Sequence, residues 1–308
     1  MSDELGTMTR RKRLAYQGML CLTCMVWGAG FPLSQAALDA GLSSLAVTFL
    51  RFALAALCML PLAFQKLRGI KKRGLFHGIA AGSILFLAFF AQILGLSLTT
   101  PSNNAFITST NVIMVPFLSW LFLKHRPAGK LFFSVLLCFL GLTLLNYHFG
   151  QGFVWNAGDW LTLLCAFGYA CHIAYLGMTS SGINSTVLSF VQFATVGILA
   201  LGGLLILEPQ SLHPAALGQA LFLRQGLWPI LFLGIFATCF AFFTQTFVQS
   251  KLSPTQTSVI LSTEAVFGCL FSVLMGYEAL TANMVAGGLL VLCATTLPEL
   301  HFNRKREK

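Results

Sequence analysis

Ten stretches of the chain are almost entirely apolar, and each is long enough to cross the hydrocarbon core of a membrane. A membrane-spanning helix needs about 20 apolar residues. The apolar positions are continuous rather than alternating, which predicts helices and excludes the strands of a membrane barrel. The ten predicted helices are 15–37, 45–64, 75–97, 102–122, 131–148, 158–178, 185–207, 227–249, 254–275 and 280–299.

The composition agrees with a chain that lies mostly in lipid. Hydrophobic residues make up 56% of the 308 residues, and charged residues make up only 9%. Soluble domains carry about 25% charged residues, so this chain cannot cover a soluble surface. Since the connections are short, no soluble domain fits between the helices. The predicted fold class is an all-α integral membrane protein with ten transmembrane helices.

The net charge of +10 comes from basic residues that gather in the connections, at 10–13, 66–73, 124–130, 251 and 304–308. Because successive helices alternate in direction, all of these clusters fall on one side of the membrane. Cytoplasmic loops carry such an excess, which predicts that both termini are cytoplasmic and that the protein lies in the plasma (inner) membrane. No soluble basic domain exists, so a nucleic-acid partner is not expected.

The chain also repeats itself. Residues 89–113 and 242–266 align without a gap and share 8 of 25 residues, and a weaker match joins 47–52 to 188–193. Two five-helix halves follow, and since five is odd, they insert in opposite orientations. Inverted repeats of this kind are typical of secondary transporters, with the substrate site between the halves. The predicted parts are a cytoplasmic tail (1–14), a first repeat (15–148), an external linker (149–157), a second repeat (158–299) and a basic cytoplasmic tail (300–308).

Three sequence features resemble the EamA-type branch of the drug/metabolite transporter superfamily. They are the Trp27-Gly28 pair, the stretch from Pro101 to Pro116, and STEAVFGCLFSVLMGYEAL at 262–280. The resemblance covers nearly the whole chain. It implies ten helices in two inverted halves and transport of small polar metabolites, often outward, and it specifies no substrate. Ala265 stands where many members carry proline.

Glu264 is the most informative candidate residue. It lies in the middle of the ninth predicted helix, between Pro254 and Met275. A carboxylate at that depth is costly and usually faces a cavity or a partner. One interpretation is a proton-coupling site or an anchor for a substrate amine. The alternative is a protonated structural carboxyl that hydrogen-bonds a neighbouring helix.

The repeat aligns Glu264 with Asn111 in the fourth helix. Asn104, Thr108 and Asn111 are spaced by four and three residues, so they share one helix face. Such a polar face in each half predicts the lining of one substrate pathway. The alternative is that these side chains join helices by hydrogen bonds.

Five further side chains are candidates for the same pathway. Gln92 and Gln245 are repeat counterparts, Trp27 lies deep in the first helix, and Tyr169 and His172 share a face of the sixth. The glutamines could hydrogen-bond a polar substrate, Trp27 could gate or stack on an aromatic one, and His172 could carry protons. For each, the alternative is packing or hydrogen bonding between helices.

Arg51 is the one basic residue inside a predicted span, about a third of the way in from the external side. The favoured interpretation is that its long side chain reaches back to the external surface. The alternative is a counter-charge for a substrate carboxylate. Its repeat counterpart Gln192 keeps the polarity but not the charge, so such a role would be asymmetric.

The sequence lacks the motifs of several other functions. It has no Walker A sequence, no HExxH and no paired nucleophile and base in the spans, so an enzyme, a cofactor and a metal ion are not predicted. The predicted function is secondary transport by alternating access, as an exporter of small polar metabolites such as amino acids. The partners are then the substrate, the lipid bilayer and protons carried by Glu264. The alternatives are an importer or exchanger of another metabolite class, and a non-transporting membrane sensor or scaffold.

Overall fold

The structure is a computed structural model that describes residues 9–123, 129–145 and 155–297. Within these residues all regular secondary structure is helical, which confirms the predicted all-α class. Eight helical stretches are long and apolar enough to cross a membrane. The basic tail at 300–308 and most of the predicted linker lie outside the described residues, as does most of the basic cluster at 124–130.

Five of the eight long stretches are single helices, and three consist of consecutive segments. The single helices are α2 (Arg10–Asp39), α3 (Ser44–Leu67), α4 (Lys72–Leu96), α8 (Ala157–Thr179) and α9 (Ser185–Leu207). The segmented stretches are α5 (Pro101–Ser109) with α6 (Asn111–Leu123), α11 (Leu227–Phe232) with η3 (Leu233–Phe240) and α12 (Ala241–Gln249), and α13 (Pro254–Leu261) with α14 (Thr263–Leu274).

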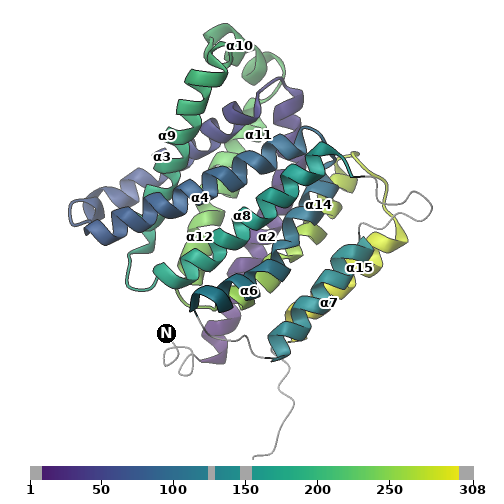
Figure 1. The fold of residues 1–308 in the computed structure, drawn as a ribbon. Helices are drawn as coiled ribbons and strands as arrows, with labels where there is room; N and C mark the ends of the chain where they lie inside the picture. Colours follow the sequence, from purple (N-terminus) through teal and green to yellow (C-terminus); the bar gives the residue numbers. More distant parts are fainter. Residues whose placement is uncertain (1–8, 124–128, 146–154, 298–308) are drawn as a thin grey trace, which may run out of the picture.

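Two further apolar helices occupy the positions of the predicted fifth and tenth spans. α7 (Gly129–Leu145) has 17 residues and α15 (Ala282–Thr296) has 15. At 1.5 Å per residue their described parts are about 22–26 Å long, and the chain on both sides of α7 lies outside the described residues, so these lengths do not decide whether the two helices cross a hydrocarbon core of roughly 30 Å. They lie side by side at the edge of the bundle (Figure 1), in close backbone contact at Gly141 and Gly287. The number of ten membrane crossings therefore stays a prediction.

The connection at 208–226 is also helical. It contains η1 (Pro209–Leu212), α10 (Pro214–Gly218) and the π-helical η2 (Gln219–Leu223), and it forms the top of the molecule in Figure 1. Its proline residues open two of these turns, because proline fits the first helical position. This segment is thus a folded cap on one end of the bundle.

Helices at equivalent positions of the two halves make equivalent contacts. α3 packs along its counterpart α9, and α7 packs along its counterpart α15. α4 packs on α8 and α9, and the stretch equivalent to α4, from α11 to α12, packs on α2 and α3. Each half therefore meets the other through the same set of helix pairs.

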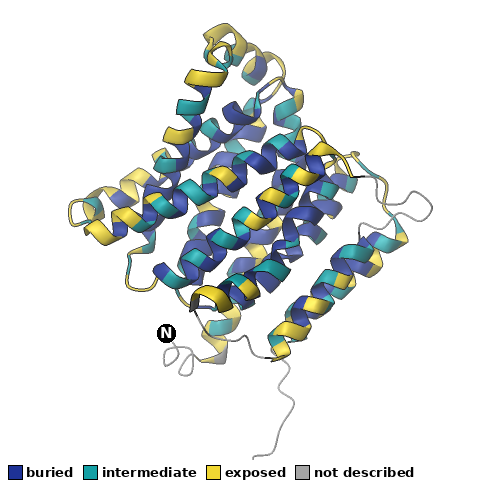
Figure 2. Cartoon of the chain, viewed as in Figure 1, coloured by how far each residue is buried: buried dark blue, intermediate teal, exposed yellow. Residues whose placement is uncertain are grey.

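Four phenylalanine rings cluster in the core where the halves meet. Phe52 and its repeat counterpart Phe193 have ring centroids 6.2 Å apart, and both are at most 1% exposed. Phe89 and its counterpart Phe242 lie 5.1 and 6.0 Å from the Phe52 ring. Figure 2 shows the buried residues on the inner faces of the helices and the exposed residues on outer faces and ends. The apolar outer faces suit contact with lipid.

Candidate functional site

The helices of the predicted fourth and ninth spans are interrupted at nearly equivalent positions. α5 and α6 are separated by Thr110, and α13 and α14 are separated by Ser262. The hydroxyls of Thr110 and of its counterpart Thr263 each donate to the carbonyl three residues earlier, at 2.6 and 2.8 Å. Such bonds compete with the regular helix ladder. As a result Asn111 and Glu264 stand in the first turns of α6 and α14, where backbone N–H groups favour negative charge.

The polar face of α5 and α6 is buried and partly used for helix packing. Asn104 is 0% exposed, and its Nδ2 donates to the carbonyl of Gln92 at 3.2 Å and to Thr162 Oγ1 at 2.8 Å. The Nδ2 of Asn111 donates to the carbonyl of Thr108 at 2.9 Å. The Oδ1 atoms of both asparagines have no hydrogen-bond partner among the described residues. The Asn104 donors thus join neighbouring helices, whereas the amide oxygens of both asparagines remain unsatisfied within the described part of the chain.

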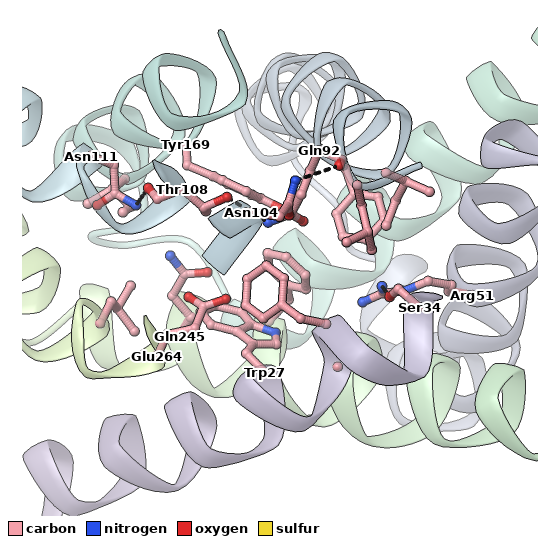
Figure 3. A pocket seen from close by; sticks show the side chains of 18 residues that line it. Trp27, Ser34, Arg51, Gln92, Asn104, Thr108, Asn111, Tyr169, Gln245 and Glu264 are labelled. Atoms are coloured by element: carbon pink, nitrogen blue, oxygen red, sulfur yellow. Dashed lines mark hydrogen bonds between the residues drawn. The ribbon is translucent and has the colours of Figure 1, made fainter. Parts of the chain in front are cut away.

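A chain of hydrogen bonds fixes the neighbouring polar side chains. Tyr169 donates its hydroxyl proton to Gln92 Oε1 at 2.9 Å, and Gln92 Nε2 donates to Thr108 Oγ1 at 3.2 Å. The three residues come from α8, α4 and α5. Together with Asn104 and Asn111, they make one polar wall (Figure 3).

The opposite wall carries Glu264, Gln245 and Trp27 (Figure 3). Trp27 donates its indole N–H to the carbonyl of Ala237 at 2.7 Å, and its ring packs against Phe242 with centroids 4.8 Å apart. Gln245 Oε1 is buried with no partner among the described residues. The Glu264 side chain is partly exposed, and no hydrogen bond or ion pair to its carboxylate is found among those residues.

Arg51 extends into the protein rather than to the external surface. It is 4% exposed, its Nε donates to Thr238 Oγ1 at 3.0 Å, and its Nη1 donates to Ser34 Oγ at 3.3 Å. Its guanidinium lies 4.3 Å from the ring centre of Phe89. The favoured prediction that Arg51 reaches the external surface is therefore wrong. The reason is that neighbouring helices supply hydroxyl acceptors and an aromatic face for a cation.

A π-helical segment, η3, supplies two of these contacts. In a π-helix the backbone bonds run to the fifth residue back, which widens the turn and often marks a functional site. The hydroxyl of Thr238 donates to the carbonyl of Leu233 at 2.7 Å, five residues earlier. The carbonyl of the residue before Thr238, Ala237, accepts from Trp27. This segment therefore fixes the side chains of both Trp27 and Arg51.

The two walls border a central cavity that is lined by 18 residues (Figure 3). Residues from both halves contribute, and the apolar part of the lining includes Phe31, Phe89, Phe242 and Leu261. Nine of the ten predicted pathway residues line it: Trp27, Arg51, Gln92, Asn104, Thr108, Asn111, Tyr169, Gln245 and Glu264. The cavity has the mixed apolar and polar lining of a small-molecule site.

Comparison with known proteins identifies the family to which this fold belongs. A model of the EamA-like transporter family matches the chain twice, over residues 15–147 and 156–297. This chain belongs to the EamA-like transporter family. The family is part of the drug/metabolite transporter superfamily.

Individual proteins that resemble this EamA-like transporter support its membership of the family. An uncharacterized transporter of Archaeoglobus fulgidus is 35% identical over 292 residues, which are 94% of this chain and 87% of that protein. The uncharacterized transporter YoaV of Bacillus subtilis is 27% identical over 146 residues, 46% of this chain and 49% of that protein. A solved crystal structure with 17% identity has the same fold, with a TM-score of 0.72 over 93% of this chain and 97% of that one. The protein is a multi-pass integral membrane transporter.

His172 is the one predicted pathway residue of this EamA-like transporter that does not line the central cavity. It is 0% exposed, and its Nε2 lies 2.8 Å from Gln192 Oε1. Because Gln192 uses its own Nε2 to donate to the carbonyl of Leu188, its Oε1 must accept, so His172 donates. The histidine therefore joins α8 to α9, as the structural alternative predicts.

Replacement of His172 by leucine should lower stability without changing transport affinity. The substitution leaves Gln192 Oε1 buried without a donor, which costs about 1–3 kcal/mol. Thermal unfolding of the purified protein measures the first effect, and the apparent KM for transport measures the second. His213→Leu, on the exposed 208–226 connection, is the control; it should leave the KM unchanged and removes only an exposed cap bond from the Ala215 N–H. A raised KM at unchanged stability would contradict the structural role.

Three groups in the site are not among the residues predicted from sequence. Thr238 is hidden among apolar residues, although it is a single hydroxyl in an otherwise apolar helix turn and could be singled out on that ground. Ser34 shares a helix face with Trp27, which is its one signal in the sequence. Phe89 and Phe242 are aligned identical residues of the repeat, and their shared position is a usable signal for the site. Nothing in the sequence marks η3 as π-helical, because a continuous apolar run has no period to interrupt.

Proposed function

We propose that the protein exports small polar metabolites that carry an amine, amino acids foremost, and that Glu264 binds the amine. The observation that carries this proposal is the Glu264 carboxylate, which borders the central cavity with no partner among the described residues. A carboxylate that deep in a membrane protein is expensive to keep without a partner. A cationic cargo would supply that partner.

The other polar groups around the cavity favour a donor-rich cargo. Gln245 Oε1, Asn104 Oδ1 and Asn111 Oδ1 all lack a donor among the described residues, whereas Asn104 Nδ2 makes two hydrogen bonds and Asn111 Nδ2 makes one. An ammonium group has three N–H donors and no acceptor. The lining therefore complements an amine better than it complements a phosphate, which would need several cations where the lining offers only Arg51.

The proposed mechanism is alternating access between two inverted repeats, at 15–148 and 158–299. The equivalent contacts of the two halves and the paired interruptions at Thr110 and Ser262 support it, because discontinuous helices are common at the sites of such transporters. Ten membrane crossings with both termini cytoplasmic belong to the same proposal, as does location in the plasma (inner) membrane. The outward direction comes from the family resemblance. A proton on Glu264 would be exchanged for the cargo in each cycle.

Comparison of metabolites inside and outside expressing cells tests the proposal. Cells with the native protein should accumulate at least one amino acid or related amine in the medium, relative to cells with an empty vector. Accumulation only of organic acids that lack an amine would contradict the role of Glu264. Indistinguishable profiles across amino acids, amines and organic acids would overturn the exporter assignment. Uptake assays would then separate the two alternatives, an importer and a non-transporting sensor or scaffold.

A further inference from the structure

Within the described part of the chain, Arg51 is a buried cation without a carboxylate partner. It comes from α3, lines the central cavity and is 4% exposed, and no carboxylate lies within ion-pair distance of it among the described residues. Its two hydrogen bonds go to neutral hydroxyls, those of Thr238 and Ser34. A guanidinium has five N–H donors in a planar fork that suits a carboxylate. A buried charge of this kind is unfavourable until an opposite charge joins it.

The π-helical segment η3 fixes the direction of the Arg51 side chain. Thr238 gives its one hydroxyl proton to the carbonyl of Leu233 at 2.7 Å, so toward Arg51 its oxygen can only accept. The Nε–H of Arg51 is the donor that meets it, at 3.0 Å. The ring of Phe89, 4.3 Å from the guanidinium carbon, supports the charged group from another side. This arrangement holds the guanidinium before any cargo arrives.

Arg51 and Glu264 lie on opposite sides of the cavity, with Trp27 between them in the view of Figure 3. They form no ion pair with each other within the described part of the chain. A cargo with one negative and one positive group could therefore meet both, whereas a simple amine would leave the guanidinium unpaired.

We propose that Arg51, positioned by Thr238 of the π-helical segment, binds the carboxylate of the cargo and makes the site selective for amino acids over amines. The proposal rests on the proposed function, because it assumes that the cargo occupies the central cavity. Thr238 is then a positioning residue: it touches Arg51 and not the cargo. A site built to hydrogen-bond one group discriminates strongly against an analogue that lacks it, because its own polar groups are left unpaired.

Binding of amino acids and of their primary amides to the purified protein tests this inference. An amide keeps the ammonium group and the side chain but removes the carboxylate charge. Titrations near neutral pH, followed by thermal shift, would use the common amino acids, their amides and the corresponding decarboxylated amines. The native protein should bind at least one amino acid about tenfold or more tightly than its amide.

Thr238→Val is the decisive variant, because valine keeps the shape and removes the acceptor for Arg51. We expect a loss of about tenfold in affinity for the amino acid and no change for the amide. Thr238→Ser keeps the hydroxyl acceptor, so it should retain the native preference for the amino acid over its amide. Thr195→Val is the matched control, since Thr195 makes a similar bond to its own helix at 2.7 Å and lies outside the cavity lining. A purely structural role of Thr238 would lower both affinities together.

The outcomes separate this inference from the proposed function. Equal binding of amino acid and amide by the native protein overturns the inference and leaves the amine site of Glu264 standing. Binding of carboxylic acids that have no amine as tightly as the amino acids, if it is lost in Thr238→Val, supports the Arg51 site and overturns the proposed function. If no amino acid, amide, amine or acid binds, both are overturned.

Discussion

Replacement of Glu264 by glutamine is expected to remove most transport activity while the protein still folds. Glutamine has nearly the same volume but cannot carry a negative charge. A charge-assisted hydrogen bond contributes about 1.5–3 kcal/mol, so affinity for an amine-bearing cargo should fall about 10- to 150-fold. No hydrogen bond to the Glu264 carboxylate is found among the described residues, so none of them loses a partner.

The stability of this variant is as informative as its activity. Removal of an unpaired charge from the interior of a membrane protein should leave the melting temperature equal to or above that of the native protein. Transport by reconstituted vesicles and thermal unfolding of the same preparation would give both quantities. Glu208→Gln, outside the cavity lining, is the matched control and should transport normally. A Glu264→Gln protein that is markedly less stable would support the structural alternative for this carboxyl.

Replacement of Gly28 by valine is expected to prevent assembly of the transporter. A Cβ atom at Gly28 would lie 2.7 Å from the carbonyl carbon of Phe267 and 2.8 Å from the backbone nitrogen of Gly268. These are backbone atoms of α14, so no side chain can turn away to make room. Separation of α2 from α14 would move Trp27 and Glu264, which are neighbours of this contact. We expect the free energy of unfolding to fall by about 3 kcal/mol or more, which is the upper end of the range for overpacking.

Gly18 provides the control on the same helix. A Cβ atom there would meet nothing within 4 Å, so Gly18→Val carries the same change in helix propensity without the clash. The yield of monodisperse protein and its melting temperature should be near native for Gly18→Val and strongly reduced for Gly28→Val. A stable Gly28→Val protein would mean that α2 and α14 do not approach as closely as the structure has them.

The contact at Gly28 also gives a physical reason for one sequence feature, the Trp27-Gly28 pair. In the sequence the Trp27-Gly28 pair is only a feature of resemblance, and the fold supplies its physical basis: the indole reaches a backbone carbonyl while the glycine admits another backbone. The sequence repeat predicts residues of the cavity because of how the two halves are arranged. Equivalent helices face the same interior, so the alignment of the two halves is enough to pair Asn111 with Glu264.

Arg51 and His172 show where prediction from sequence reaches its limit. Both lie on predicted spans, yet the direction of each side chain depends on a partner from another helix, Thr238 for one and Gln192 for the other. Hydropathy gives the depth of a residue but not the neighbour that it meets. The π-helical segment that receives Arg51 is equally hidden, because it interrupts no apolar pattern.

The differences between the two halves at aligned positions have a consequence for the orientation of a bound cargo. Arg51 of the first half aligns with Gln192, which is engaged with His172, and Glu264 of the second half aligns with Asn111. A protein made of two identical halves would offer each binding group twice, so a cargo could enter in two equivalent poses. Here the acidic group and the basic group come from different halves. On the proposed function, neither half alone forms the site, and the cargo is held in a single direction relative to the chain.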